Sequence, residues 1–252
     1  MELKMEFIDD CSFLFRLKEM LDIIEREEIG AIESAAEAAY RSITNDGLLH
    51  VFSTGHSHMI VEEMFYRCGG LIAVNPILSD ELMLHVHAVT STLMERQPGK
   101  ATKLLTNAGI AKDDTIIISS NSGINAVPVE AALYAKSCGL TVVCVTSKKA
   151  SESLTPRHES GKRLFEAADI VIDNHAPLGD GLVQIPGNGQ ATGGASTFGS
   201  LFIAQRIVLK IENLYIQDGK IPPVYQSANL PGGDDFNAEI IKKYAGRIKA
   251  LS

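Results

Sequence analysis

Five short runs of apolar, mostly β-branched residues recur along the chain, and stretches with helical periodicity separate them. Strands that alternate with helices are typical of a parallel sheet with helices on both faces, because each parallel connection needs a crossover. The sequence therefore predicts an α/β fold around a five-stranded parallel sheet. The expected strands are residues 50–54, 71–74, 115–119, 141–146 and 170–172.

Helical segments surround these strands. Residues 1–47 are predicted to form a helical lead-in, in which apolar residues recur at steps of three and four up to Gly47. A break near Glu28, Ile29 and Gly30 predicts a hairpin of two helices within this lead-in. Further helices are expected at residues 59–67, 127–138 and 197–215, with two more inside 79–109.

Two later segments lack regular periodicity. Residues 179–199 are rich in glycine, which fits a flexible linker or a close approach of the backbone to a ligand; their position after the last strand favours the second. Residues 221–252 form a C-terminal extension that is expected to be irregular up to residue 237. The chain is expected to form one domain over residues 1–252.

The composition is that of a globular protein. Hydrophobic residues make up 45% of the 252 residues and charged residues 21%, which excludes a disordered chain. The net charge of −8 argues against nucleic acid as a partner, whereas one phosphate group needs only local N–H and hydroxyl donors. Neither a signal-peptide pattern nor a bilayer-spanning stretch is evident, so we expect a cytoplasmic protein without a membrane partner.

The four cysteines are Cys11, Cys68, Cys138 and Cys144. They show none of the short spacings that are typical of metal or redox sites. We therefore expect them to be buried free thiols.

A polar stretch follows the third predicted strand. Residues 119–125 read Ser-Ser-Asn-Ser-Gly-Ile-Asn and lead into the helix expected at 127–138. Such a turn suits an anion, because N–H groups at a helix start are unpaired and the helix dipole favours negative charge. The same residue types are also common in ordinary turns and N-caps. We call residues 119–125 the serine turn.

A second turn with the same pattern follows the first predicted strand. Gly55, His56, Ser57 and His58 lie between the strand at 50–54 and the next helix. The ends of parallel strands meet at the carboxyl edge of a sheet, where open α/β sheets bind ligands. The two turns together therefore predict a phosphate site at that edge. We call residues 55–58 the histidine turn.

These motifs resemble the SIS (sugar isomerase) domain family of phosphosugar isomerases, lyases and regulators. The likeness rests on Gly55-His56-Ser57 and on the serine turn, and it spans about residues 34–215. More narrowly, residues 55–59, 67–71 and 227–234 resemble an uncharacterised bacterial SIS-domain family. The resemblance implies a flavodoxin-like three-layer sandwich, a homodimer, and a phosphorylated sugar held at the carboxyl edge of the sheet.

By position in that family, the serines of both turns are expected to contact the phosphate. Asn125 stands where the family usually has threonine; an amide still donates a hydrogen bond but lacks the compact hydroxyl. The phosphosugar-binding residues that the resemblance and the location of the turns imply are Gly55, Ser57, His58, Ser120, Asn121, Ser122, Gly123 and Asn125.

The family also implies a catalytic glutamate and often a histidine that opens the sugar ring. Glu95 is the first candidate, since a partly buried carboxylate can take up and return a proton. The alternative is an exposed helix residue paired with a neighbouring charge. His56 is a candidate by its location. His85 and His87 lack a further ligand at a suitable spacing, so no metal site is predicted.

The sequence leaves two functions open and argues against a third. The first is an enzyme that isomerises a phosphorylated sugar, or eliminates a substituent from it, by abstracting a proton next to a carbonyl group. The second is a non-catalytic sensor or regulatory module for a sugar phosphate. A nucleotide-binding flavodoxin-like protein is disfavoured because no Walker or Gly-x-Gly-x-x-Gly motif follows a strand. No cofactor is predicted.

Overall fold

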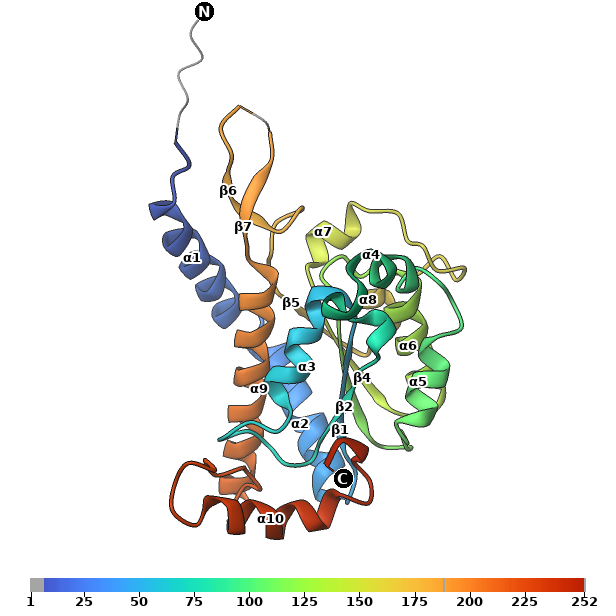
Figure 1. The fold of residues 1–252 in the computed structure, drawn as a ribbon, viewed down its shortest axis with the longest axis vertical. Helices are drawn as coiled ribbons and strands as arrows, with labels where there is room; N and C mark the ends of the chain where they lie inside the picture. The colour runs from blue at the N-terminus through green and yellow to red at the C-terminus, as the bar shows by residue number, and fades with distance from the viewer. Residues whose placement is uncertain (1–6, 188, 252) are drawn as a thin grey trace, which may run out of the picture.

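The computed structural model describes residues 7–187 and 189–251, and it contains the predicted five-stranded parallel sheet (Figure 1). The strand order, β2-β1-β3-β4-β5, is that of flavodoxin-like sheets. The connections reverse direction between the adjacent strands β1 and β3, which makes this pair the topological switch point. The strands are β1 (Leu49–Ser53), β2 (Val74–Ile77), β3 (Thr115–Ser119), β4 (Thr141–Thr146) and β5 (Ile170–Asp173).

Helices cover both faces of the sheet. One face carries α2 (Ile29–Thr44), α3 (Met59–Met64) and α9 (Ser196–Gln217), and the other carries α5 (Ala101–Asn107), α6 (Ala126–Ser137) and α8 (Leu164–Ala167). Successive strand residues point to opposite faces: in β3, Ile117 packs in the core with α2 and α9, while Ile116 and Ile118 pack with α5 and α6. The predicted three-layer sandwich is confirmed.

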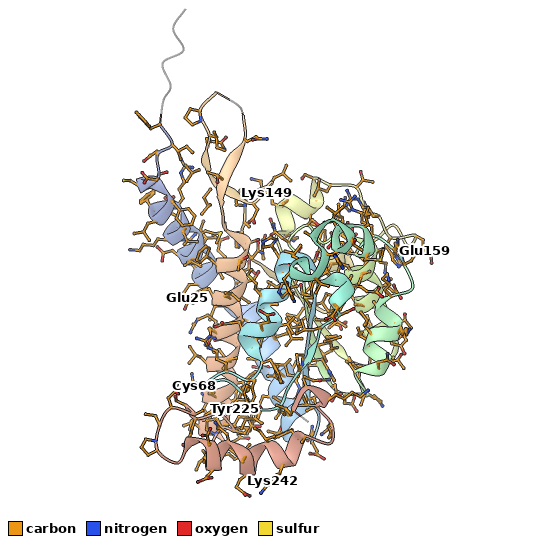
Figure 2. The ribbon with its side chains drawn as sticks, viewed as in Figure 1. Glu25, Cys68, Lys149, Glu159, Tyr225 and Lys242 are labelled. Carbon is orange, nitrogen blue, oxygen red and sulfur yellow. The ribbon has the colours of Figure 1, made fainter. Side chains whose placement is uncertain are left out.

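The prediction of a helical hairpin in the lead-in is wrong. Glu28 alone separates α1 (Cys11–Glu27) from α2, and a single residue is too short a link to reverse the chain between two helices. The two helices instead run on with a bend (Figure 1). α1 projects beyond the sheet and packs beside α9. There the guanidinium of Arg206 on α9 donates two hydrogen bonds of 2.7 Å to the carboxylate of Glu25 on α1 (Figure 2).

The second strand lies three residues later than predicted, because β2 begins at Val74. The apolar residues before it pair with the C-terminal segment: Ile72 N–H donates to the Pro223 carbonyl at 3.0 Å, and Leu71 forms a bridge with Val224. β2 then extends through Pro76, which lacks an N–H group. An edge strand tolerates proline, and β2 is at the edge of the sheet.

The glycine-rich segment forms a hairpin rather than a loop. β6 (Gly181–Gln184) pairs antiparallel with β7 (Ala191–Gly194), and a side chain at Gly181 would meet the backbone of Ala191 at 2.5 Å. Gly181 thus allows the two strands of the hairpin to approach closely. The C-terminal extension also contains more structure than predicted, because α10 (Gly233–Tyr244) begins inside the stretch that was expected to be irregular.

Five further helical segments complete the described chain. They are η1 (Gly55–His58), η2 (Asp80–Leu82), α4 (Leu84–Met94), α7 (Lys148–Glu152) and η3 (Lys249–Leu251). Two helices within residues 79–109, α4 and α5, confirm that part of the prediction. Within the described residues, no helix is both long enough and apolar enough to cross a bilayer.

The expectation for the cysteines holds only in part. Cys144 on β4 is fully buried, and burial raises the pKa of its thiol. Cys138 is half-buried, whereas Cys11 and Cys68 are exposed. Cys11 is at the exposed start of α1, ahead of the residues that this helix buries, and Cys68 lies in a surface turn next to Tyr225 (Figure 2).

A buried polar network ties the amino ends of β1, β2 and β3 together. His50 on β1 donates from Nε2 to Asp114 Oδ2 at 2.9 Å, and its Nδ1 accepts from the Asn75 amide at 3.0 Å. The Asp114 carboxylate also accepts the backbone N–H groups of Leu48 and Ala111, at 2.9 and 3.0 Å. Each polar group is thus satisfied, and together they fix the register of the switch-point strands.

We predict that Asp114→Asn destabilises the fold by about 1–3 kcal/mol at pH 7, because one buried donor loses its acceptor. Burial alone would raise the pKa of Asp114, but hydrogen bonds from His50 and the Leu48 and Ala111 N–H groups lower it below the usual range of an aspartate. The stabilisation is therefore present above about pH 4 and is lost as the pH falls through the lowered pKa. Urea unfolding of wild type and Asp114→Asn checks this at pH 7 and again at a pH below about 4, where the difference in unfolding free energy should shrink.

The exposed neighbour Asp113 provides the control. Asp113→Asn keeps a residue type that tolerates its φ of 70° and touches no buried donor, so its stability should stay within about 0.5 kcal/mol of wild type. An Asp114→Asn protein as stable as Asp113→Asn would show that the network contributes nothing.

Candidate functional site

The two predicted turns lie together at the carboxyl edge of the switch-point strands. β1 and β3 are paired in register from Leu49–Thr115 to Ser53–Ser119. At the last pair, the Ser53 hydroxyl donates to the Ser119 carbonyl at 2.6 Å. The histidine turn and the serine turn therefore leave the sheet from adjacent strand ends, where doubly wound sheets bind ligands.

The serine turn is held in shape by the neighbouring strands. The Ser120 hydroxyl accepts the Gly123 N–H at 3.3 Å, and the Thr146 hydroxyl at the end of β4 donates to the Ser120 carbonyl at 2.7 Å. The Asn174 amide, just after β5, donates to Asn121 Oδ1 at 3.2 Å. Ser122 is half-buried, and its hydroxyl forms no hydrogen bond within the described chain. That hydroxyl is free to contact a ligand.

The start of α6 is less open than the sequence pattern implies. The Val127 N–H donates to the Glu95 backbone carbonyl at 3.0 Å, and Pro128 has no N–H group. Two of the first three helical positions therefore offer no donor to a ligand. Anion binding here depends mainly on the serine turn itself.

Glu95 follows α4 and lies against both turns. Its carboxylate accepts the Thr54 hydroxyl at 2.9 Å and the Asn125 amide at 2.6 Å. Burial raises the pKa of Glu95, although the Thr54 hydrogen bond and the charges of Arg96 and Arg157 oppose this effect. A half-buried carboxylate with a raised pKa suits proton transfer better than the exposed ion pair that was the alternative interpretation.

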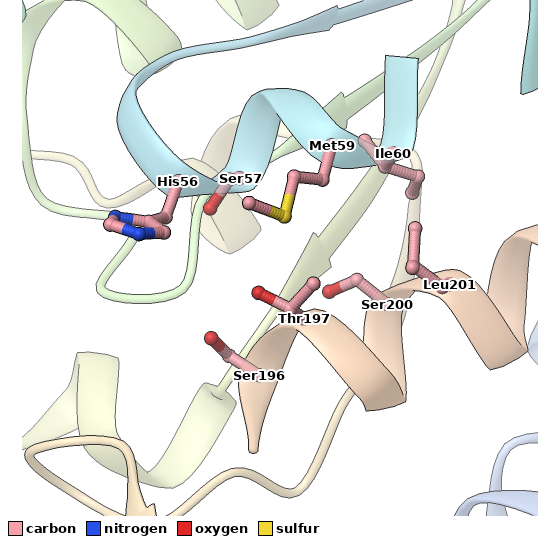
Figure 3. A pocket seen from close by; sticks show the side chains of 8 residues that line it. All are labelled: His56, Ser57, Met59, Ile60, Ser196, Thr197, Ser200 and Leu201. Carbon is pink, nitrogen blue, oxygen red and sulfur yellow. The ribbon is translucent and has the colours of Figure 1, made fainter. Parts of the chain in front are cut away.

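The histidine turn places its two histidines differently. His58 is buried, and its Nδ1 donates to the Gly55 carbonyl, so it supports the turn. His56 is exposed. Ser57 lines a pocket between η1 and the start of α9, where its hydroxyl faces Thr197 and Ser200 (Figure 3).

Several polar residues at this edge were not predicted from the sequence. Asn174 links the serine turn to α9, because its amide donates to Asn121 and also lies 3.4 Å from the Ser200 hydroxyl. The signal for it was weak, since a lone asparagine after a strand is common in turns. The residues that sequence reasoning missed are Thr54, Arg157, Asn174, Ser196, Thr197 and Ser200.

His85 and His87 both lie on α4, and the backbone at His87 is not helical. The centroids of the His85 and His58 rings are 6.1 Å apart. Among the described residues, no cluster of three or more histidine, cysteine or acidic side chains is arranged to hold a metal ion.

The sequence comparisons place the chain in a family. The SIS domain model matches residues 12–147, so the chain belongs to the SIS domain family. Within it the chain is similar to the UPF0309 proteins. One from Halalkalibacterium halodurans is 40% identical over 94% of this chain and 97% of its own length. Another, from Listeria innocua, is 38% identical over 92% of this chain and 94% of its own length.

Solved structures with the same fold are more distant in sequence. The phosphoheptose isomerase of Francisella tularensis has a TM-score of 0.51 at 17% identity and covers 81% of this chain and 96% of its own. NanR of Vibrio vulnificus, in complex with ManNAc-6P, has a TM-score of 0.50 at 13% identity. The match covers 94% of this chain and 69% of the NanR chain. These likenesses confirm the predicted SIS fold.

We predict that Gly123→Ala distorts the serine turn. Gly123 has a φ of 60°, and an added Cβ would lie 2.9 Å from Thr146 Oγ1 and 3.1 Å from Ser151 Oγ. The left-handed backbone costs a side chain about 1–2 kcal/mol, and the overlap adds about 1–3 kcal/mol. Urea unfolding measures the total.

Gly161→Ala is the matched control. Gly161 has a similar φ of 69°, but a Cβ there would meet nothing within 4 Å. The excess loss in Gly123→Ala reports the packing under the turn. An equal loss in both proteins would mean that the turn yields to a side chain.

Proposed function

We propose that the protein binds a phosphorylated sugar at the carboxyl edge of β1 and β3 and moves a proton next to its carbonyl carbon. The phosphate is held by Ser57, Ser120, Ser122 and the backbone of the serine turn, which offer hydroxyl and N–H donors without a fixed charge. Asn125, the last residue of this turn, is the N-cap of α6 and brings its side-chain amide to Glu95. The wider relationship to phosphoheptose isomerases supports the choice of ligand class.

The observation that carries this proposal is the position of the Glu95 carboxylate. It lies at the junction of the two turns, bonded to Thr54 on one side and to Asn125 on the other. A carboxylate there can take a proton from the carbon beside the carbonyl. Returning it to the neighbouring carbon gives isomerisation, whereas loss of a leaving group gives elimination. His56, exposed at the histidine turn, is proposed to assist ring opening.

A sensor that binds the sugar phosphate without turnover is the second candidate. The likeness to NanR supports it, because NanR was solved in complex with ManNAc-6P. The hydrogen bonds that occupy both Glu95 oxygens also suit a carboxylate that accepts from sugar hydroxyls without abstracting a proton. The experiments below separate the two.

We predict that binding depends on the phosphate group. Phosphorylated hexoses or amino sugars should raise the Tm, and their unphosphorylated forms should not. A ligand at a hundredfold excess over its Kd adds about 2.7 kcal/mol of stability. Ser122→Ala should weaken binding by about 1–3 kcal/mol through the loss of a hydrogen bond to a charged group. Thermal shift with matched sugar pairs is the measurement, and equal responses within each pair would refute the phosphate site.

We predict that Glu95→Gln separates binding from chemistry. The glutamine oxygen can still accept from Asn125 and its amide can donate to the Thr54 hydroxyl, so the site should keep its shape. Sugar-phosphate affinity should stay within a few-fold, while proton exchange should fall by about a hundred- to ten-thousandfold. NMR of deuterium exchange beside the carbonyl measures this. Undiminished exchange would exclude Glu95 as the base, and no exchange in wild type would favour the sensor.

We also propose a homodimer. Large apolar side chains remain exposed on the projecting α1 and at the start of α9, including Leu14, Phe15 and Phe198. Covering such side chains is a common role of subunit contacts. Light scattering at micromolar concentration should give about twice the chain mass of 27.2 kDa. A monomer mass would reject the dimer.

A further inference from the structure

The loop between α7 and α8 is fastened to the serine turn. The Arg157 N–H donates to the Ile124 carbonyl at 2.8 Å, and the Leu164 N–H donates to the Gly123 carbonyl at 2.7 Å. The Arg163 guanidinium closes the loop by donating to the carbonyls of Ser151 and Leu154, at 2.9 and 3.0 Å. The loop, in which Figure 2 labels Glu159, is therefore a built part of the site's wall.

Three side chains from separate segments form a relay across this wall. Arg157 Nη1 donates to Asn125 Oδ1 at 2.6 Å, and Asn125 Nδ2 donates to Glu95 Oε1 at 2.6 Å. Arginine can only donate and a carboxylate can only accept, so the orientation of the Asn125 amide between them is determined by chemistry. The relay uses both ends of the amide.

We propose that Arg157 is a positioning residue, which acts through Asn125 to hold the Glu95 carboxylate ionised and aimed at the ligand. As far as catalysis is concerned, this inference rests on the proposed function, whereas the relay itself does not. It also accounts for an amide at position 125. Asparagine presents a donor and an acceptor on separate atoms, whereas the single oxygen of threonine would have to serve both neighbours.

Few other groups near Glu95 could hold its carboxylate ionised. On its own segment the neighbouring charge is Arg96, which also lowers the pKa of Glu95, and from the α7–α8 loop the charge is Arg157. The turn after β1 brings Thr54 and Gly55 close, both uncharged. The titratable groups of that turn are the exposed His56 and the buried His58. Without Arg157, the Asn125 oxygen loses its donor, and the amide that donates to Glu95 is no longer held from its other end.

The first test needs no ligand. Protein with carbon-13 in the glutamate carboxyl groups is titrated by NMR, and the Glu95 signal is assigned by its absence in Glu95→Gln. In Arg157→Met the titration midpoint of Glu95 should move to higher pH. Lys162→Met is the matched control, since it removes an equal charge from an exposed position in the same loop and should leave the midpoint unchanged. An unchanged midpoint in Arg157→Met overturns the proposal.

A double-mutant cycle separates the relay from charge acting through space. The relay predicts that Arg157→Met moves the Glu95 midpoint less in an Asn125→Ala background than in wild type. An equal shift in both backgrounds would show that Asn125 transmits nothing and would overturn the proposal. Arg157→Lys keeps the charge but not the planar guanidinium, so it should restore only part of the wild-type midpoint.

The second test uses the sugar phosphate that gives the largest thermal shift. Arg157→Met should keep its affinity within a few-fold and move the acid limb of the exchange–pH profile to higher pH. Loss of affinity with an unchanged Glu95 midpoint would make Arg157 a ligand contact and overturn the positioning role. If no sugar phosphate binds to wild type, the proposed function fails, but the ligand-free titration still decides whether the relay exists.

Discussion

The parallel pairing of β1 with β3 is the constraint on which the rest of the structure depends. Its register places Leu49 opposite Thr115 and Ser53 opposite Ser119. The buried carboxylate of Asp114 fixes the amino end of the pair, and a hydroxyl-to-carbonyl bond fixes the carboxyl end. A slip by one residue would send each strand's side chains to the wrong face and would pull the histidine turn and the serine turn apart.

The site forms where several independent segments converge on one turn. β4 supports the serine turn through Thr146, and the end of β5 does so through Asn174. The segment after α4 supplies Glu95, whose backbone binds α6 while its side chain binds Asn125. The candidate base and the candidate anion site are therefore fastened to each other at two levels, by main chain and by side chain. Precise placement of this kind is what proton transfer requires.

Much of the fold could be predicted from the sequence because the strands of a doubly covered sheet are mostly apolar. β3 and β4 were predicted to the residue, since they are central strands without polar interruptions. β2 was misplaced because its apolar neighbours Leu71 and Ile72 are buried by a segment about 150 residues away in sequence, which no local pattern reveals. The hairpin at β6 and β7 was missed because glycine carries no periodicity.

The candidate site was predicted unevenly for a related reason. A motif of consecutive residues, such as the serine turn, can be recognised in the sequence. Arg157 and Asn174 reach the site only through tertiary contacts, which the sequence does not show. Glu95 was located by resemblance to a family, and its burial and partners became evident from the fold.

Pro76 in β2 has a consequence for how copies of this chain can associate. An open sheet edge is a template for strands from other molecules, and a proline removes one of the N–H groups such a strand would need. β2 is the edge strand beyond β1, and Leu71 and Ile72 just before it are already paired with residues 223–224. Growth of the sheet into a neighbouring molecule is disfavoured at this edge. The β2 edge is therefore a poor template for cross-β aggregation, and contacts between copies there are expected to form without extending the sheet.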